Sequence, residues 1–376
     1  MSLSEYICAK YEIMKCGIVG LPNVGKSTLF NCLSNAKAQA ANFPFCTIEP
    51  NVGTVNVPDS RLQMLESLVL PDKVVPATVE IVDIAGLVKG ASKGEGLGNQ
   101  FLGNIRECNA ILHVLRCFDN DNIIHVDGSV DPIRDKETID IELQLKDLES
   151  IEKRLDKVRK ISKTGDKDAM RETEMADRLK KFIESGKSVR SFVRTEEESR
   201  WITNYQLITD KPILYVCNVD EMAAKNGNHY VDEVKIMASK EGSHLMHLAV
   251  AIEADIVELD DYEERSLFLD DMGLDEPGVN RIIRAAYSML NLQTYFTAGV
   301  KEVRAWTIEN GFTAPQSAGV IHSDFEKGFI RAEVISYSDY IEFKNEIAVK
   351  EAGKMRVEGK EYLVQDGDVV HFRFNV

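Results

Sequence analysis

The chain has 376 residues, of which 44% are hydrophobic and 28% charged, and its formal net charge is -16 at pH 7. This balance is ordinary for a globular protein and excludes a wholly disordered or collagen-like chain. No apolar run reaches the roughly 20 residues that a membrane span needs. Strong non-specific binding to DNA is not expected, because the phosphate backbone attracts clustered positive charge.

The cysteines and the N-terminus predict a cytoplasmic protein. The seven cysteines are odd in number and include no C-x-x-C pair, which argues against a zinc site or a disulfide framework. Several lie among apolar neighbours and are expected in the core. No secretory signal is recognisable. Residues 1–13 are interpreted as an N-terminal extension, because the first strand-like run begins beside Met14.

Apolar runs rich in β-branched residues alternate with helical patterns in the first part of the chain. The runs interpreted as buried strands are Cys16–Val19, Thr78–Val82, Ala110–Leu115 and Ile213–Cys217. Such strands, separated by helices, are typical of a mostly parallel sheet that is covered on both faces. The pattern predicts an α/β fold for residues 14–134 and 201–291.

Residues 135–200 predict a helical hairpin inserted into this fold. Apolar residues recur at steps of three and four, which places them on one face of a long helix. These residues are Ile141, Leu145, Leu148, Ile151, Leu155, Val158 and Ile161. Residues 163–167 predict a turn. The second amphipathic helix carries Met175, Leu179, Phe182 and Ile183.

Residues 292–376 predict a small separate α+β domain. Val300–Trp306, Gly328–Ile335 and Asp368–Phe374 are rich in β-forming residues and are separated by Gly, Pro and Ser turns.

A phosphate-binding loop is the most specific motif. Residues 20–27, Gly-Leu-Pro-Asn-Val-Gly-Lys-Ser, fit G-x-x-x-x-G-K-[ST] and lie between a predicted strand and the predicted helix Thr28–Leu33. The backbone N–H groups of such a loop and the N-terminus of its helix bind phosphate oxygens. Lys26 is expected to reach the β- and γ-phosphates, and the Ser27 hydroxyl to ligate Mg²⁺.

Two further segments predict a nucleotide switch rather than a small-molecule kinase. Asp83 follows a predicted strand and is expected to hold Mg²⁺, while the Gly86 amide contacts the γ-phosphate. Thr47 lies between the two motifs, where a switch loop supplies a further magnesium ligand. Five glycines between residues 86 and 98 make Leu87–Gln100 permissive, as expected of a loop that orders on the γ-phosphate.

The base-reading element departs from the usual guanine-specific Asn-Lys-x-Asp. Residues 218–221 are Asn-Val-Asp-Glu, so the lysine is absent and Glu221 is one methylene longer than the usual aspartate. The residues predict weakened guanine selectivity and favour adenine only weakly, because adenine offers a lone pair at N1 where guanine offers a donor. Ala249, Val250 and Ala251 are expected to lie against the base.

With these motifs the chain resembles the YchF subfamily of Obg-like ATPases, which are P-loop proteins of the translation-factor class. The resemblance covers nearly the whole chain from Met14. It is most specific at residues 20–28, 42–50, 83–100, 218–221, 292–306 and 325–331. It implies a Ras-like G domain, an inserted helical hairpin and a C-terminal TGS domain of β-grasp fold. It also implies a preference for ATP over GTP, and the ribosome as partner.

The resemblance also implies roles for individual residues. The phosphates are bound by Asn23, Val24, Gly25, Lys26, Ser27 and Thr28, magnesium by Ser27 and Thr47, and the base by Asn218 and Val219.

Hydrolysis needs a group that this sequence lacks at the usual place. Leu87 stands where many GTPases have a glutamine that orients the attacking water, and leucine has neither donor nor acceptor. Asn23 is a candidate ligand for a monovalent cation such as K⁺. His125, beyond a strand end, is a candidate to reach the γ-phosphate by a loop motion, and the resemblance favours His125 as the catalytic residue.

Two alternatives to an ATP-driven switch in translation or stress control remain open. One is an adaptor whose nucleotide is mainly a structural ligand, which Leu87 favours. The other is a GTP-specific ribosome-assembly GTPase. An acidic chain that meets RNA is expected to do so through a restricted basic surface or through ribosomal proteins. The predicted surface on the hairpin consists of Lys153, Arg154, Lys157, Arg159 and Lys160.

Overall fold

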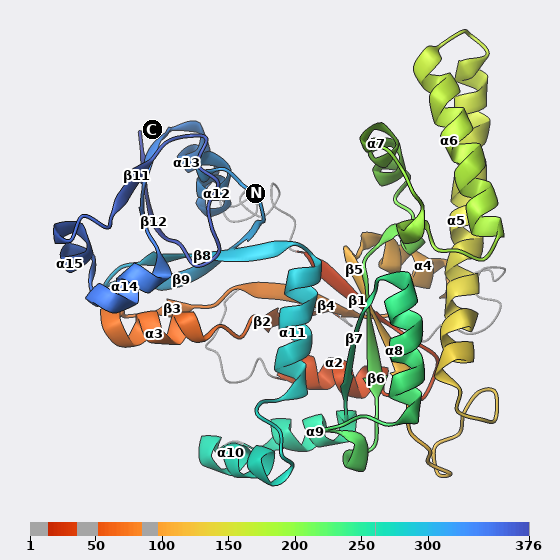
Figure 1. The fold of residues 1–376 in the computed structure, drawn as a ribbon, viewed down its shortest axis with the longest axis horizontal. Coiled ribbons are helices and arrows are strands. Elements are labelled where there is room, and N and C mark those ends of the chain that lie inside the picture. The colour runs from red at the N-terminus through yellow and green to blue at the C-terminus, as the bar shows by residue number, and fades with distance from the viewer. Residues whose placement is uncertain (1–13, 36–51, 85–96, 260, 376) are drawn as a thin grey trace.

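The computed structural model describes residues 14–35, 52–84, 97–259 and 261–375. They form two sheets and a long helical arm (Figure 1). None of the helices in these residues combines the length and the apolar character needed to cross a bilayer. The predictions for residues 1–13, Thr47, Gly86 and Leu87 lie outside the described residues.

The first sheet is the predicted, mostly parallel one, with the order β2-β4-β1-β5-β6-β7. Its strands are β1 (Lys15–Val19), β2 (Val52–Asn56), β4 (Thr78–Asp83), β5 (Ala110–Arg116), β6 (Ile213–Asn218) and β7 (His244–Leu248). Only the pair β2 and β4 is antiparallel. The four predicted strands are confirmed at its centre. β5 and β6 are buried at every residue, because helices cover both faces.

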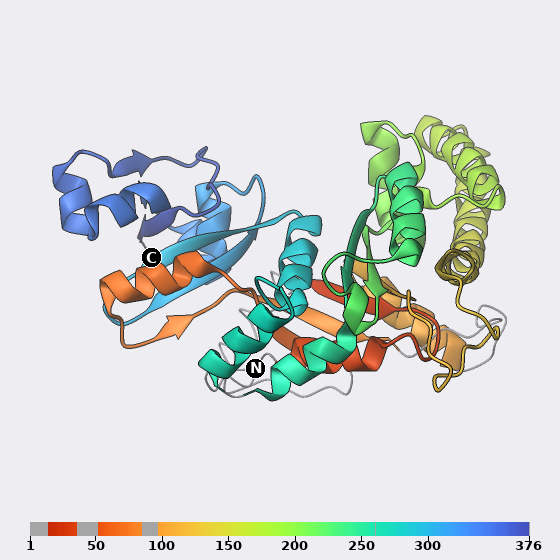
Figure 2. The ribbon, with the colours of Figure 1, turned by 60° about the horizontal axis from the view of Figure 1, so that its bottom comes forward.

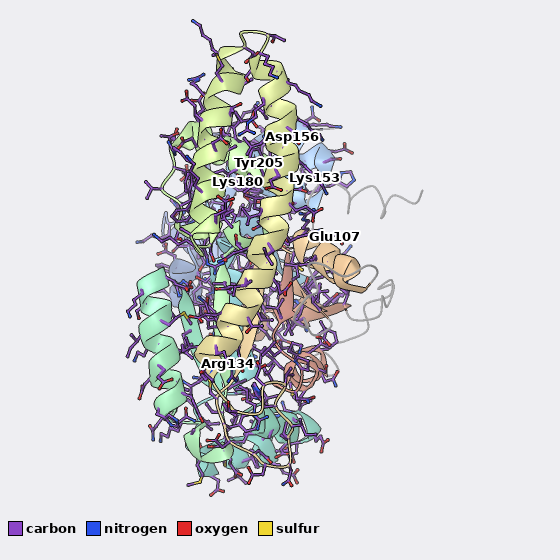
Figure 3. All side chains as sticks on the ribbon, turned by 90° about the vertical axis from the view of Figure 1, so that its right-hand side faces the viewer. Glu107, Arg134, Lys153, Asp156, Lys180 and Tyr205 are labelled. Atoms are coloured by element: carbon purple, nitrogen blue, oxygen red, sulfur yellow. The ribbon has the colours of Figure 1, made fainter. Side chains whose placement is uncertain are left out.

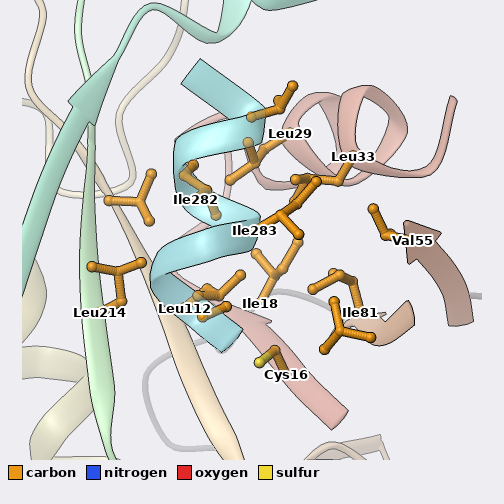
Figure 4. Packing of buried hydrophobic residues seen from close by; sticks show 14 of the residues in the cluster. Cys16, Ile18, Leu29, Leu33, Val55, Ile81, Leu112, Leu214, Ile282 and Ile283 are labelled. Atoms are coloured by element: carbon orange, nitrogen blue, oxygen red, sulfur yellow. The ribbon is translucent and has the colours of Figure 1, made fainter. Parts of the chain in front are cut away.

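The helices around this sheet are α2 (Lys26–Asn35), α4 (Leu97–Glu107), α8 (His229–Glu241), α9 (Val250–Glu258), α10 (Tyr262–Asp271) and α11 (Gly278–Met289). Figure 4 shows how Leu29 of α2 and Ile282 and Ile283 of α11 pack beside Ile18 of β1 in one hydrophobic core. The five described cysteines are buried and free, as predicted for core residues.

The arm is the predicted antiparallel hairpin. It consists of α5 (Pro132–Ser162) and α6 (Lys167–Glu184), joined by residues 163–166. Figure 3 shows the two helices side by side, with Arg134 near the base of α5 and Lys153 and Asp156 farther along it. The predicted limits at residues 135 and 200 fall inside α5 and α7 (Glu196–Tyr205).

The predicted apolar face of α5 is not buried along its whole length. Ile141, Leu145 and Ile161 are exposed by 55%, 41% and 52%. The reason is that α5 changes its packing partner along its length. Ile139 packs into the core of the first sheet, whereas Ile151 belongs to the separate core that α5 forms with α6.

A buried carboxylate fixes the arm to the body. Asp147 of α5 is fully buried and accepts hydrogen bonds from the backbone N–H groups of Ile208 and Thr209, both at 2.8 Å. These two residues belong to the short 3-10 helix η3 (Ile208–Asp210), which leads into β6. Another short 3-10 helix, η2 (Val189–Ser191), follows α6.

The second sheet has the order β11-β10-β12-β8-β9-β3. Its C-terminal strands are β8 (Leu292–Ala298), β9 (Val303–Glu309), β10 (Phe329–Ile335), β11 (Arg356–Glu358) and β12 (Val369–Phe374). The helices between them are α12 (Ala314–Ile321), α13 (Ser323–Lys327), α14 (Tyr337–Phe343) and α15 (Glu346–Glu351). Tyr295, Phe329 and Phe372 form its own hydrophobic core. The predicted α+β character of this region is confirmed.

The second sheet also takes in an early part of the chain. α3 (Ser60–Val69) and β3 (Val74–Val75) lie against it, and β3 pairs in parallel with β9 (Figure 2). The β2–β4 pairing extends to Val57 and Ala77. Residues 58–76 are therefore an excursion from the first sheet to the second. The predicted division, which kept all of residues 14–134 with the nucleotide-binding fold, differs from this arrangement.

Candidate nucleotide-binding site

The predicted phosphate loop joins the carboxyl end of β1 to the start of α2. Gly25 has a φ of 99°, and a Cβ there would lie 2.4 Å from the Asn218 side chain, so glycine is required by both conformation and space. At Gly20 a Cβ would lie 2.5 Å from the carbonyl oxygen of Val114. Val24 is buried, whereas Asn23, Ser27 and Thr28 are exposed. The loop thus presents the predicted polar residues at the surface.

Lys26 is buried within this loop. Its Nζ donates to the carbonyl oxygen of Leu21 at 2.6 Å, which closes the loop around its own lysine. Desolvation lowers the pKa of Lys26 to about 8, although the charge of Asp83 opposes the shift. A phosphate group at the loop would supply the negative charge that this buried ammonium lacks.

Ser27 and Asp83 lie together at the carboxyl edge of the first sheet, as expected for a magnesium site. The Ser27 hydroxyl donates to Asp83 Oδ2 at 3.3 Å. Asp83 Oδ1 is buried and has no hydrogen-bond partner within the described residues. Burial raises the pKa of Asp83, and the charge of Lys26 lowers it in part. Hard oxygen ligands and an unpartnered carboxylate oxygen fit Mg²⁺.

The predicted base-reading segment follows β6. Asn218 is buried and links the two loops, since its Nδ2 donates to Val24 O at 2.9 Å and its Oδ1 accepts from Val250 N at 3.1 Å. Val219 is also buried, whereas Glu221 is exposed at the first residue of the 3-10 helix η4 (Glu221–Ala223).

Of the three residues expected against the base, Ala249 and Val250 are buried and Ala251 is exposed. Val250 is the first residue of α9, and its N–H is the group that Asn218 binds. The structure therefore brings the phosphate loop, the segment after β6 and the segment after β7 together at one edge of the sheet.

His125 lies beside the phosphate loop but faces the arm. Its Nε2 lies 2.8 Å from Asp135 Oδ2, and its Nδ1 accepts from the N–H of Asp127 at 3.1 Å. The backbone of the preceding residue contacts the phosphate loop, because Asn23 Nδ2 donates to the carbonyl oxygen of Ile124 at 3.2 Å.

Two residues at this site were not predicted from the sequence. Asp135 belongs to the first turn of α5 and is buried; burial raises its pKa, and the hydrogen bond from His125 lowers it in part. Arg116, at the end of β5, donates to the carbonyl oxygens of Phe118, Asn120 and Ile123. Arg116 directly follows the predicted strand Ala110–Leu115, and a charged residue at the end of this buried strand was the signal that could have indicated its role in holding the next loop.

Two family models match separate parts of the chain. A family model described as 50S ribosome-binding GTPase matches residues 15–163. A second model, for the C-terminal part of YchF GTPases and described as a protein of unknown function, matches residues 292–375.

The relatives are similar over their full length. "Ribosome-binding ATPase YchF" of Haemophilus ducreyi is 58% identical over 362 residues, which cover 96% of this chain and 99% of the relative. The protein of the same name from Bacillus subtilis is 55% identical over 365 residues, covering 96% and 100%. The solved structure of the Schizosaccharomyces pombe YchF GTPase has a TM-score of 0.87 and 39% identity, and covers 96% of this chain and 97% of that one. By identity, coverage and fold, the chain belongs to the YchF family.

Proposed function

We propose that this protein is a ribosome-binding, magnesium-dependent ATPase that works in the cytoplasm as a nucleotide-controlled switch. The observation that carries the proposal is that Lys26, Ser27 and Asp83 lie together at the carboxyl edge of the first sheet. They adjoin a loop in which the conformation and close contacts of Gly25 require glycine. The names of the relatives from Haemophilus ducreyi and Bacillus subtilis support ATP as substrate and the ribosome as partner.

Different residues of the site are assigned to the phosphates and to Mg²⁺. Backbone N–H groups of residues 23–28 and the N-terminus of α2 hold the phosphates. Lys26 exchanges its bond to Leu21 for the β- and γ-phosphates. Ser27 and Asp83, with Thr47, hold Mg²⁺, which neutralises phosphate charge when bound. Gly86 is assigned to the γ-phosphate.

We assign the preference for ATP to the segment after β6. Glu221 replaces the aspartate that rewards guanine, and Val219 replaces the lysine of the usual motif. Isothermal titration of ATP and GTP in the presence of Mg²⁺ tests the assignment. Tighter binding of ATP supports it, and a clear preference for GTP would leave a GTPase of the same architecture. Lys26→Ala, which removes the phosphate ligand, is the control for specific binding.

We assign the catalytic role to His125, with K⁺ at Asn23 as a second contribution. Asn23 Nδ2 is engaged by Ile124, and its Oδ1 is the atom assigned to the cation. His125→Ala is expected to abolish most hydrolysis without changing nucleotide affinity, and Asn23→Ala to remove any difference between K⁺ and Na⁺. Turnover of His125→Ala at the wild-type rate would remove the histidine from the mechanism.

One observation favours the adaptor alternative. Both ring nitrogens of His125 are occupied by protein groups, so that the enzyme at rest has no free catalytic histidine. Turnover measured with and without ribosomes separates the two functions. A switch shows faster hydrolysis with ribosomes, whereas an adaptor binds ribosomes with negligible turnover under either condition.

A further inference from the structure

The His125 side chain is held at both of its ring nitrogens. Since the N–H of Asp127 donates to Nδ1 at 3.1 Å, the proton of the imidazole lies on Nε2. Nε2–H therefore donates to Asp135 Oδ2 at 2.8 Å. The side chains of His125 and Asp135 are only 6% and 2% exposed. A histidine that acts on water or on a phosphate oxygen needs a free ring nitrogen, so one of these bonds has to break first.

The backbone around His125 is fixed independently of this bond. The guanidinium of Arg116, itself 2% exposed, holds the carbonyl oxygens of residues 118, 120 and 123 at 2.9–3.1 Å. The next carbonyl, that of Ile124, accepts from Asn23 in the phosphate loop. The loop is thus anchored up to the residue before His125, and release of the Nε2–H donor for a phosphate oxygen requires the loss of the Asp135 bond rather than the unfolding of the loop.

We propose that Asp135 is a positioning residue that holds His125 in a resting orientation, and that release from Asp135 limits hydrolysis in the absence of the ribosome. The proposal rests on the proposed function, because it takes His125 as the catalytic residue. A hydrogen bond to a buried carboxylate is among the stronger ones in proteins, and it opposes the departure of the imidazole. Asp135 sits on the first turn of α5, the helix that continues into the arm.

The other groups that face His125 do not replace this contact. Arg134 binds the second oxygen of Asp135, with its Nη2 3.2 Å from Oδ1, and so keeps the carboxylate in place. Asp127 holds the ring through its backbone, and its side chain is exposed. Donor atoms of His125, Asp127 and Asp135 lie within 4.8 Å of one another. A metal ion at this cluster would have to displace one of the two existing hydrogen bonds to the imidazole. The geometry therefore favours the direct hydrogen bond between His125 and Asp135 over a metal site.

The test compares steady-state hydrolysis by full-length variants without ribosomes. Asp135→Ala is expected to raise kcat about tenfold with KM for ATP unchanged, because loss of a charged hydrogen bond shifts an equilibrium by about this factor. Asp135→Asn keeps an acceptor without the charge and is expected to give a smaller rise. Asp121→Asn is the matched control, since it removes one exposed carboxylate from the same loop without touching His125 or Asp135, and its kcat is expected to match the wild type.

Two further measurements separate the possible failures. The double variant His125→Ala/Asp135→Ala is expected to be as slow as His125→Ala, because the gain acts through the histidine. A fall in kcat for Asp135→Ala, or a rate equal to that of Asp121→Asn, in protein with a wild-type melting temperature would overturn the proposal and leave the catalytic role of His125 intact. Full activity of His125→Ala would overturn both, while loss of activity in Lys26→Ala would still identify the ATPase.

Discussion

The side-chain amide of Asn218 joins the phosphate loop to the first residue of α9. Nδ2 donates to Val24 O at 2.9 Å, and Oδ1 accepts from Val250 N at 3.1 Å. All three residues are buried, so neither backbone group can turn to water instead. Asn218 is therefore a clamp between two segments of the site as well as a candidate ligand of the base.

Asn218→Ala is expected to weaken the binding of ATP and ADP alike, by about 10- to 100-fold, because the two buried backbone groups lose the partner that holds the phosphate loop in its binding conformation. Isothermal titration measures both affinities. Asn218→Asp keeps the shape but loses the donor to Val24, and we expect it to bind weakly too. Unchanged phosphate binding with altered base preference would show that the clamp is dispensable.

Nucleotide binding should depend on pH through Lys26. Burial lowers the pKa of Lys26 to about 8, and a bound triphosphate favours the charged ammonium. Above this pH the free protein has lost the proton and the complex regains it, so ATP binding takes up a proton and affinity falls as pH rises. We expect uptake to approach one proton near about pH 9 and to be small near about pH 7.5.

Titration in two buffers of different ionisation enthalpy measures this uptake, and equal uptake at both pH values would contradict it. Through Lys26, the stability of the fold changes with pH in the opposite direction to the affinity for ATP. Between about pH 8 and the unfolded value of about 10.4, the folded chain binds fewer protons at Lys26 than the unfolded chain, so this group makes the free energy of unfolding rise with pH.

The basic residues predicted on the arm divide into those that form ion pairs and those that do not. Lys153, Arg154 and Arg159 form ion pairs with Glu149, Glu172 and Asp177. Within the described residues, the lysines of the tip form no ion pair. They are Lys157, Lys160, Lys163 and Lys167, and all four are exposed.

Lys157→Glu/Lys160→Glu is therefore expected to weaken ribosome association by about tenfold or more, because both lysines are free to meet phosphates, and to reduce its dependence on salt. Co-sedimentation at several salt concentrations is the measurement. Lys235→Glu/Lys240→Glu on α8 makes the same change of charge at exposed positions outside the two helices of the arm. Equal losses in both variants would point to total charge and not to the tip.

The contact of Arg61 with the C-terminal region should contribute to stability. Its Nη1 lies 2.7 Å from Asp366 Oδ2, its Nε lies 2.9 Å from Asp59 Oδ1, and its guanidinium stacks on Phe296 at 5.3 Å. Arg61→Ala is expected to lower the free energy of unfolding by about 1–2 kcal/mol, since Asp366 is half exposed. Urea denaturation measures it. Arg61→Lys keeps the charge but not the fork and should recover only part.

Features formed by residues that are adjacent in the sequence, or that end neighbouring strands, were predicted best. Residues 20–27 specify both a turn and its ligand, and Asp83 and Asn218 end strands whose parallel order brings them to the same edge. Contacts that depend on the path of loops were missed. Nothing in the sequence distinguishes Asp135 from the other acids of α5, and its bond to His125 follows only from the loop that Arg116 shapes.

The pattern of α5 shows a second limit. Regular spacing identified the helix, but spacing alone does not reveal that Ile139 faces the sheet core while Ile151 faces α6. The predicted stripe therefore included Ile141 and Ile161, which are exposed. Likewise, Arg61 and Asp366 are 305 residues apart, and no local signal connects them.

The path of residues 58–76 has a mechanical consequence. A domain attached by a single peptide can swing and twist about that joint. Here the described chain passes between the two halves three times, on the way out at residue 58, on the way back at residue 76, and again between α11 and β8. Three connections restrict rotation more than one does, so we expect the C-terminal region to follow any tilt of strands β2 and β4. Thr47, predicted to bind magnesium, precedes β2 in the chain, and Gly86, predicted to contact the γ-phosphate, follows β4. A tilt of these strands on nucleotide binding is therefore expected to change the orientation of the C-terminal region.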